Sequence, residues 1–264
     1  MQGIALVKNL GKSYGDKVIF HKLDMTIGRN EPIVIMGDNG CGKSTFLKIL
    51  AGVLLHTEGE IEYYPNIKIS FIPDRFPKLP FSVEEYLMHM GRIQGVSASL
   101  INDYIDEYFG LLNMPLDFRK TKIGNCSKGT IQKVNILQAL ITKPDLLVMD
   151  EPFSGLDEDS EEGLLELIHK LALDGVAIVL ACHEKKLAQR ITDRIYIFSD
   201  KQCRIINGFA QQYRIIFIDK ADGRNEVLVE KADLPEALGM LISKGHEIYS
   251  VNPRHIKTGG GQDE

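Results

Sequence analysis

The N-terminal part of the chain alternates short stretches, most of them apolar, with turn residues. These stretches cover Ile4–Val7, Gly11–Gly15, Val18–Phe20 and Leu23–Ile27, and their spacing predicts four short strands. Pro32–Met36 is apolar throughout, which is typical of a strand buried on both faces of a parallel sheet. The pattern therefore predicts a β-rich start that leads into a buried parallel strand.

Helical spacing dominates the next part of the sequence. Ser44–Ala51 carries apolar residues in helical period and ends at Gly52, a residue type that commonly follows a helix. Ser82-Val83-Glu84-Glu85 then matches a capping box, the usual start of a helix, and Leu100–Leu112 continues in helical period. We predict a mostly helical insertion over about residues 76–142.

Strands and helices alternate after this insertion. Leu146–Met149, Val176–Ala181 and Ile195–Phe198 have the pattern of strands, and Glu161–Leu173 has that of a helix between the first two. Such alternation is typical of a parallel α/β core. The first domain is expected to span residues 1–204.

The C-terminal part of the chain, residues 205–264, is predicted to be a small α+β domain. Its pattern indicates two strands, a helix and a last strand, at Tyr213–Ile218, Glu226–Val229, Leu234–Lys244 and Glu247–Val251. The Gly-rich tail after Thr258 is expected to be disordered.

Composition narrows the class of protein. The apolar fraction of 44% and the charged fraction of 25% match an ordinary globular protein. A net charge of −5 without long basic runs argues against nucleic acid as a main partner. The longest apolar runs, such as Val176–Cys182, hold about seven residues, whereas a membrane-spanning helix needs roughly twenty. The first residues also lack a signal-peptide pattern, so a cytoplasmic location is expected.

The four cysteines are predicted to be free thiols. Cys41, Cys126, Cys182 and Cys203 are widely spaced and form no CxxC pair, so neither a zinc site nor a disulfide framework is indicated. Three of them lie in or beside the motifs described below. Small residues fit all three places; inhibition by thiol oxidation is the alternative interpretation.

A phosphate-binding loop is the sharpest chemical signal. Residues 37–45 match GxxxxGK[ST] between a predicted buried strand and a predicted helix, which is the setting this motif requires. Lys43 is expected to bridge the β- and γ-phosphates and Ser44 to ligate Mg²⁺, while the helix N-terminus favours anions. The predicted nucleotide-binding residues here are Gly37, Asn39, Gly40, Cys41, Gly42, Lys43, Ser44 and Thr45.

Two acids follow the apolar strand Leu146–Met149. Asp150 and Glu151 should lie at the edge of an open α/β sheet where ligands bind. Asp150 is expected to hold Mg²⁺, and Glu151 to orient and deprotonate an attacking water. A solvated acidic turn is the alternative if the segment is taken alone.

Together these motifs resemble the nucleotide-binding subunit of ABC transporters, over about residues 1–200. The resemblance implies a P-loop NTPase cassette with a parallel-sheet core, an N-terminal antiparallel β subdomain and a helical subdomain at about 76–142. The family places Ser and Gly of an LSGGQ-type segment on the ATP of the opposite subunit. Here the matching stretch retains Ser127 and Gly129, whereas Cys126, Lys128 and Thr130 depart from the pattern.

Further residues match the family one by one. Ser154-Gly155-Leu156-Asp157 resembles the D-loop, which crosses the dimer interface, and His183 matches the switch histidine that contacts the γ-phosphate. Tyr14 matches the aromatic residue that stacks on adenine; the alternative is a simple turn residue. At the position of the family's usual Gln the chain has Asp74, which can still support Mg²⁺ but cannot donate a hydrogen bond as an amide does.

The resemblance implies an ATPase with ATP and Mg²⁺ as ligands. The expected catalytic residues are Lys43, Glu151 and His183, and the expected metal ligands are Ser44, Asp74 and Asp150. The expected partners are a second cassette, as a homodimer, and a separately encoded membrane permease that holds the chain at the inner face of the membrane.

An exporter is favoured, because the Ser-Lys-Gly signature and the C-terminal domain resemble efflux cassettes. The alternative is a soluble ABC-type ATPase that acts on ribosomes or an assembly scaffold. A P-loop kinase or GTPase is disfavoured, because the chain lacks an NKxD-type motif.

Overall fold

The computed structural model describes residues 3–207, 211–219, 223–230 and 234–255. It divides the chain into two compact units, Met1–Ile205 and Ile206–Glu264. The first unit begins with β1 (Gly3–Tyr14), β2 (Lys17–Gly28), β3 (Ile33–Gly37), α1 (Lys43–Leu50), β4 (Glu58–Tyr63) and β5 (Ile69–Ile72). It continues with α2 (Val83–Ile93), α3 (Ala98–Leu111), the 3₁₀ turns Leu116–Lys120 and Ile123–Asn125, and α4 (Lys128–Leu140). It ends with β6 (Leu146–Asp150), α5 (Glu158–Leu173), β7 (Ala177–Ala181), α6 (Lys185–Ile191), β8 (Arg194–Ser199) and β9 (Gln202–Asn207), and β9 crosses the boundary between the two units.

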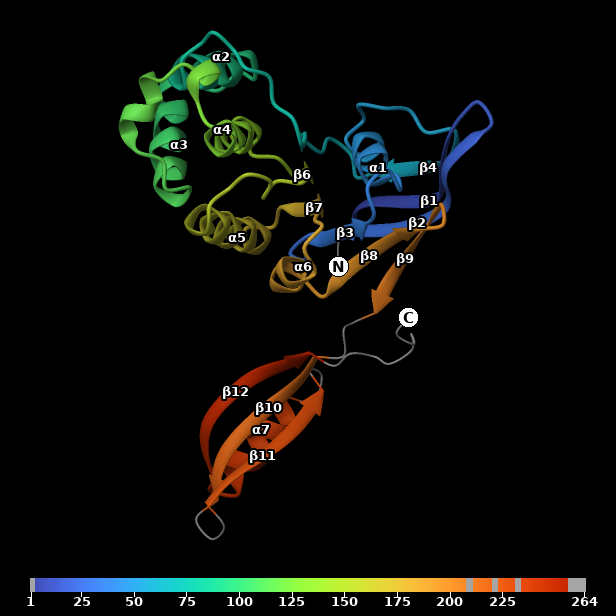
Figure 1. Ribbon diagram of the computed structural model, residues 1–264, viewed down its shortest axis with the longest axis vertical. Helices are drawn as coiled ribbons and strands as arrows, with labels where there is room; N and C mark the ends of the chain where they lie inside the picture. The colour runs from blue at the N-terminus through green and yellow to red at the C-terminus, as the bar shows by residue number, and fades with distance from the viewer. Residues whose placement is uncertain (1–2, 208–210, 220–222, 231–233, 256–264) are drawn as a thin grey trace. The chain divides into compact units, whose positions relative to one another are not determined.

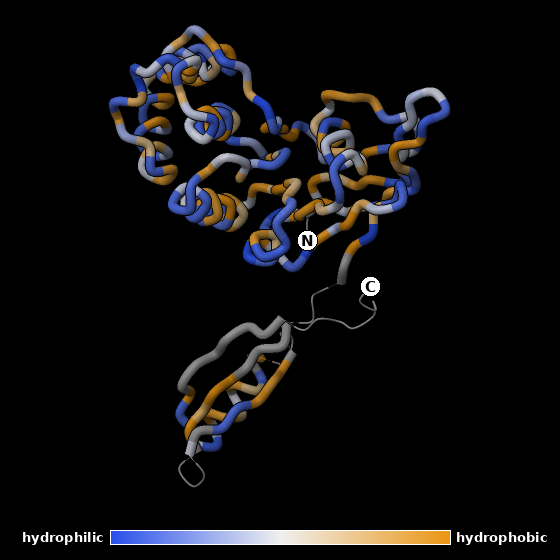
Figure 2. The backbone as a smooth tube through the Cα atoms, viewed as in Figure 1, coloured by the Kyte–Doolittle hydropathy of each residue, from blue (hydrophilic) through white to orange (hydrophobic). Residues whose placement is uncertain are grey.

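A six-stranded sheet in the order β5-β6-β7-β3-β8-β9 forms the centre of the first unit. The pairs from β5 through β8 are parallel, as the alternating pattern predicts. Every residue of β6 and β7 is buried, and Figure 2 shows the hydrophobic colour along the central strands of this unit. The burial of these apolar strands on both faces supplies the main driving force for the core.

The β-rich start forms two long strands, so the prediction of four short ones is wrong. β1 and β2 each contain twelve residues and pair antiparallel, with β4 on the other edge of β1. Asn9 and Lys22 adopt left-handed φ angles of 47° and 51°, and the register shifts between Val7 and Leu10. Such bulges let a strand continue through residues that interrupt the apolar pattern.

The predicted helical insertion is present as α2, α3 and α4. Its predicted capping box is confirmed, because the Ser82 amide donates to Glu85 Oε2 at 2.8 Å and the Glu85 amide donates to Ser82 Oγ at 3.2 Å. In Figure 1, α2 and α3 lie at one end of the first unit, and the antiparallel strands β1, β2 and β4 lie at the other. The parallel sheet connects these two ends.

Two elements near the end of the first unit were not predicted. The sequence gives only a weak signal for α6, since four of its seven residues are Lys, Gln or Arg, and the polar strand β9 follows β8 after a tight turn. In the described part of the chain, no helix combines the length and the apolar content needed to cross a bilayer.

The second unit contains β10 (Gln211–Asp219), β11 (Gly223–Glu230), α7 (Leu234–Ser243) and β12 (Glu247–His255). Its strands form an antiparallel sheet in the order β11-β10-β12. The three strands and the helix expected from the sequence are all present. The tail after Thr258 lies outside the described residues.

Candidate active site

The phosphate loop connects β3 to α1 and depends on its glycines. Gly37 and Gly42 have φ angles of 142° and 116°, in the region that side chains disfavour. A Cβ atom on Gly37 would lie 2.4 Å from the carbonyl oxygen of Phe198. The loop therefore packs directly on the backbone of β8, and only glycine fits at this point.

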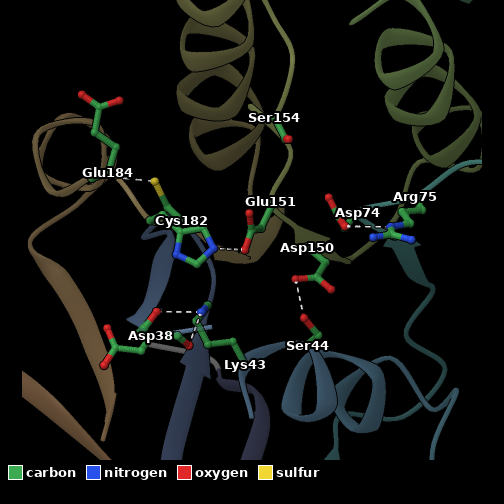
Figure 3. Close-up of polar contacts among 12 residues, drawn as sticks. Asp38, Lys43, Ser44, Asp74, Arg75, Asp150, Glu151, Ser154, Cys182 and Glu184 are labelled. Atoms are coloured by element: carbon green, nitrogen blue, oxygen red, sulfur yellow. Dashed lines mark hydrogen bonds and ion pairs between the residues drawn. The ribbon is translucent and has the colours of Figure 1, made fainter. Parts of the chain in front are cut away.

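Lys43 is the first residue of α1, and its side chain turns back into the loop. Nζ donates hydrogen bonds to the carbonyl oxygens of Gly37 and Asp38, at 2.7 and 3.0 Å, as Figure 3 shows. The residue is only 4% exposed. A buried ammonium needs such partners, so the loop itself holds this positive charge where the predicted phosphates would bind.

Ser44 and Asp150 meet where α1 faces the end of β6. Ser44 Oγ donates to Asp150 Oδ1 at 3.1 Å (Figure 3), and Asp150 is 3% exposed. Burial raises the pKa of Asp150 above its usual value, the carboxylates of Glu151 and Asp74 raise it further, and the hydrogen bond from Ser44 lowers it. A cation bound here would stabilise the ionised Asp150 carboxylate against the effects of burial and of the neighbouring negative charges.

These groups fit Mg²⁺, whose preferred ligands are oxygen atoms. Mg²⁺ is usually held by one or two carboxylates, with phosphate and water oxygens completing the shell. Among the residues that the structure describes, no group of three His, Cys, Asp or Glu side chains could hold a metal. Ser44, Asp150 and, directly or through water, Asp74 are the chain's own candidate ligands.

Glu151 and His183 form the second half of the site. Glu151 has a φ angle of 53°, a left-handed conformation that costs about 1–3 kcal/mol in a non-glycine residue. Its Oε1 pairs with His183 Nε2, and the two side chains are 26% and 41% exposed. His183 also lines a cavity of about 420 Å³ with Gly37, Asp38 and Asn39. His183 is thus accessible from the phosphate loop.

The segment Cys126–Thr130 lies at a different place, at the start of α4. Ser127 Oγ caps this helix by accepting from the Thr130 amide at 3.1 Å. A Cβ atom on Gly129 would lie 2.5 Å from the Gly155 carbonyl oxygen, and Lys128 Nζ donates to Ser154 Oγ at 2.8 Å. In the described parts of the chain, no hydrogen bond joins Ser127 or Gly129 to the phosphate loop. The structure therefore does not bring these predicted ATP ligands to the chain's own phosphate loop.

Tyr14 ends β1 and presents an open aromatic ring. The residue is 52% exposed, and the Lys12 ammonium lies 4.7 Å from the centroid of its ring. Lys12 itself is held by a hydrogen bond to the Leu55 carbonyl oxygen at 2.8 Å. An exposed ring can stack on a base, and the fixed ammonium limits the ways in which the base can approach.

The cysteines are free thiols, as predicted. Burial raises the pKa of Cys126, that of Cys182 to about 11 and that of Cys203 to about 12. Since the thiolate is the reactive form, oxidation at these three positions is disfavoured. Cys41, in the phosphate loop, is only partly buried.

Sequence reasoning missed the buried polar residues of α4. Gln132 and Asn135 are 4% and 0% exposed, and their amides donate to the carbonyl oxygens of Pro152 and Pro73. The available signal was the recurrence of amide side chains at every third position of this helix, at Gln132, Asn135 and Gln138. These contacts reach the residues next to Glu151 and Asp74.

Comparison with known proteins gives consistent results. A family model described as ABC transporter matches residues 20–154. The Nod factor export ATP-binding protein I of Bradyrhizobium diazoefficiens is 30% identical over an alignment of 263 residues that covers 94% of this chain and 80% of that protein. The zinc import ATP-binding protein of Hydrogenovibrio crunogenus is 28% identical over 203 residues, 74% of this chain and 79% of that protein.

The fold also matches solved structures. A dimeric ATP-binding cassette, solved in a post-hydrolysis state with ADP and Pi, aligns with a TM-score of 0.68 at 24% identity. The alignment covers 77% of this chain and 98% of that one. At this level of identity the match establishes the fold, an α/β cassette with a parallel-sheet core and an antiparallel subdomain.

Proposed function

The chain belongs to the ABC transporter family, and we propose that its ATP hydrolysis drives a separately encoded membrane permease. Family membership makes the chain an ATP-binding cassette ATPase. The observation that carries the site assignment is the convergence of three strand ends. β3 leads into the loop around Lys43, β6 delivers Asp150 and Glu151, and β7 leads to His183. Open α/β sheets bind their ligands at this edge.

In the proposed mechanism each residue has a distinct task. Lys43 and the amides of the phosphate loop hold the β- and γ-phosphates, and Tyr14 stacks on the adenine. Ser44 and Asp150, with Asp74, would hold Mg²⁺, which when bound would neutralise charge on the phosphate oxygens. Glu151 orients the attacking water and accepts its proton, and His183 holds the Glu151 carboxylate in place through the contact between their side chains.

A second cassette completes the site in this proposal. Ser127 and Gly129 lie at a helix N-terminus, where backbone amides favour an anion. Gly129 lies against the Gly155 carbonyl, and Lys128 between them donates a hydrogen bond to Ser154. A head-to-tail pair of identical chains would place this segment over the ATP of the partner. Both Ser154 and Gly155 would then lie at the interface.

Export is the direction we propose. The exporter relative aligns over 94% of the chain, whereas the zinc import relative aligns over 74%. The additional alignment includes the C-terminal unit, since that unit starts at Ile206. The Ser127-Lys128-Gly129 form of the signature also supports an efflux cassette.

Glu151→Gln tests the ATPase assignment. Because the amide keeps the shape of the side chain but cannot accept a proton, ATP binding should be retained while kcat falls at least about 100-fold. The matched control is Glu166→Gln, an exposed acid on α5, which should keep both values within about twofold. Unchanged hydrolysis in Glu151→Gln would refute the assignment.

The same variant tests the partner. The Glu151→Gln variant is to be purified from its host in mild detergent and ATP. We expect a polytopic membrane protein to co-purify with it, which would identify the permease. Recovery of ribosomes or soluble proteins alone would leave the ATPase chemistry standing and overturn the transport assignment.

A further inference from the structure

A chain of amide side chains runs along one side of α4. Gln138 Nε2 donates to Asn135 Oδ1 at 3.5 Å, and Asn135 Nδ2 donates to Gln132 Oε1 at 3.4 Å. At one end of this chain, the Tyr86 hydroxyl of α2 donates to Gln138 Oε1 at 3.1 Å. At the other end, Gln132 Nε2 donates to the Pro152 carbonyl oxygen at 3.3 Å. Every bond has a defined direction, because a carbonyl oxygen can only accept.

The shortest hydrogen bond made by this chain of amide side chains joins Asn135 to the loop that carries Asp74. Asn135 Nδ2 donates to the Pro73 carbonyl oxygen at 2.9 Å, and the residue is 0% exposed. A fully buried amide needs its hydrogen-bond partners, because water cannot replace them. The contact between Asn135 and Pro73 is therefore a built-in part of the structure.

This contact fixes the backbone just before Asp74. The Pro73 carbonyl belongs to the peptide unit whose nitrogen is that of Asp74, and a peptide unit is planar. The Asp74 side chain has little other support, since it is 41% exposed and its ion pair with the exposed Arg75 is 3.8 Å long. Such exposed pairs contribute little to order. The direction of Asp74 thus depends on its backbone.

The same helix also reaches Glu151 and Ser127. Gln132 binds the carbonyl oxygen of Pro152, the residue after Glu151, and α4 begins directly after Ser127. One rigid helix therefore contacts the backbone beside both acids of the chain's own site. Its N-terminus also carries the segment expected to bind the ATP of the partner.

We propose that Asn135 is a positioning residue for ATP hydrolysis. It holds the Pro73–Asp74 peptide against α4, so that the Asp74 carboxylate moves together with the helix that begins after Ser127. The inference rests on the proposed function and deepens it.

The first test is amide hydrogen exchange of the purified full chain. Asn135→Ala removes the donor while alanine keeps the helix, so the amides of Asp74–Phe76 should exchange at least about tenfold faster. The control is Tyr86→Phe, which removes the hydrogen bond to Gln138 at the other end of the chain of amide side chains and keeps the ring that contacts Phe76. It should leave that exchange within about twofold of wild type.

The second test is a double-mutant cycle on kcat. Asn135→Ala should lower kcat about tenfold and leave the Kd for ATP within about twofold, whereas in an Asp74→Ala background it should add less than about a twofold loss. Tyr86→Phe should lower kcat by less than about twofold in both backgrounds.

Two outcomes would overturn the inference. One is an equal loss of kcat from Asn135→Ala with and without Asp74, and the other is unchanged exchange at Asp74–Phe76. Failure of the proposed function has a different signature, because the wild-type chain would then hydrolyse no ATP while the exchange experiment still reported on the contact.

Discussion

At the scale of single residues, the site combines buried and accessible groups. Lys43 and Asp150 are almost fully buried. The Lys43 ammonium donates a hydrogen bond to the phosphate loop, and Asp150 accepts one from Ser44. Glu151 and His183 remain partly accessible. This division suits phosphoryl transfer, in which fixed charges hold the phosphates while water must reach the base.

The cysteines yield a prediction about thiol reactivity. With a pKa of about 11, Cys182 has roughly one thiolate in 10⁴ at pH 7, and Cys203, with a pKa of about 12, has fewer. In native protein at pH 7, iodoacetamide should therefore label Cys41 first, as read by mass spectrometry of the peptides. Labelling of Cys182 should rise as the pH is raised and in denaturant.

ATP provides a control for this labelling. Because Cys41 lies in the phosphate loop, bound ATP should slow its modification and leave the other cysteines unchanged. Native labelling of Cys182 as fast as that of Cys41 at pH 7 would contradict the burial argument.

The predictability of the site also differs from residue to residue. Motif and spacing alone located Lys43, Ser44, Asp150 and Glu151, because each follows a strand whose apolar pattern is clear. The Lys128–Ser154 contact could not be foreseen, since the tertiary fold joins the first residue of α4 to a loop that is distant in the sequence. Nor could the left-handed conformation of Glu151, which sequence propensity disfavours.

At the scale of elements, the apolar pattern predicted best where burial is complete. β3, β6 and β7 are fully or largely buried and were predicted nearly to the residue. The β1–β2 pair was predicted as shorter pieces, because bulges at Asn9 and Lys22 carry the chain through polar positions. β4 was missed because charged residues alternate along it.

The contact of α4 with Ser154–Gly155 gives a prediction at this scale. In Gly129→Ala the new Cβ would lie 2.5 Å from the Gly155 carbonyl oxygen, so the two segments must separate. We expect kcat to fall at least about tenfold while the Kd for ATP stays within about twofold.

Gly110→Ala is the matched control for this substitution. It lies on α3 with no atom near the added Cβ, and alanine should stabilise that helix by up to about 1 kcal/mol. Its kcat should remain unchanged. If Gly129→Ala also kept full kcat, the close approach of these segments would not matter for hydrolysis.

At the scale of the whole molecule, one chain contains every part of the site but not in one place. The phosphate loop, Asp150, Glu151 and His183 gather at the edge of the parallel sheet, while Ser127 and Gly129 lie at the start of α4, where Lys128 contacts Ser154 and Gly129 lies against Gly155. We therefore propose that a second copy of the chain completes each ATP site.

Subunit mixing shows whether two chains share each ATP site. Lys43→Ala damages the phosphate loop, and Ser127→Asp keeps a capping oxygen for α4 while placing negative charge where the γ-phosphate of the partner would bind. Each variant alone should hydrolyse almost no ATP. A mixed dimer has one intact site, formed by the phosphate loop of Ser127→Asp and the Ser127 segment of Lys43→Ala.

The measurement is the ATPase rate of the two inactive variants mixed in equal amounts. With random pairing, half of the dimers carry one intact site of two, so we expect recovery of about a quarter of the wild-type rate. A mixture as inactive as its two components, beside an active wild-type protein, would contradict a site shared between subunits.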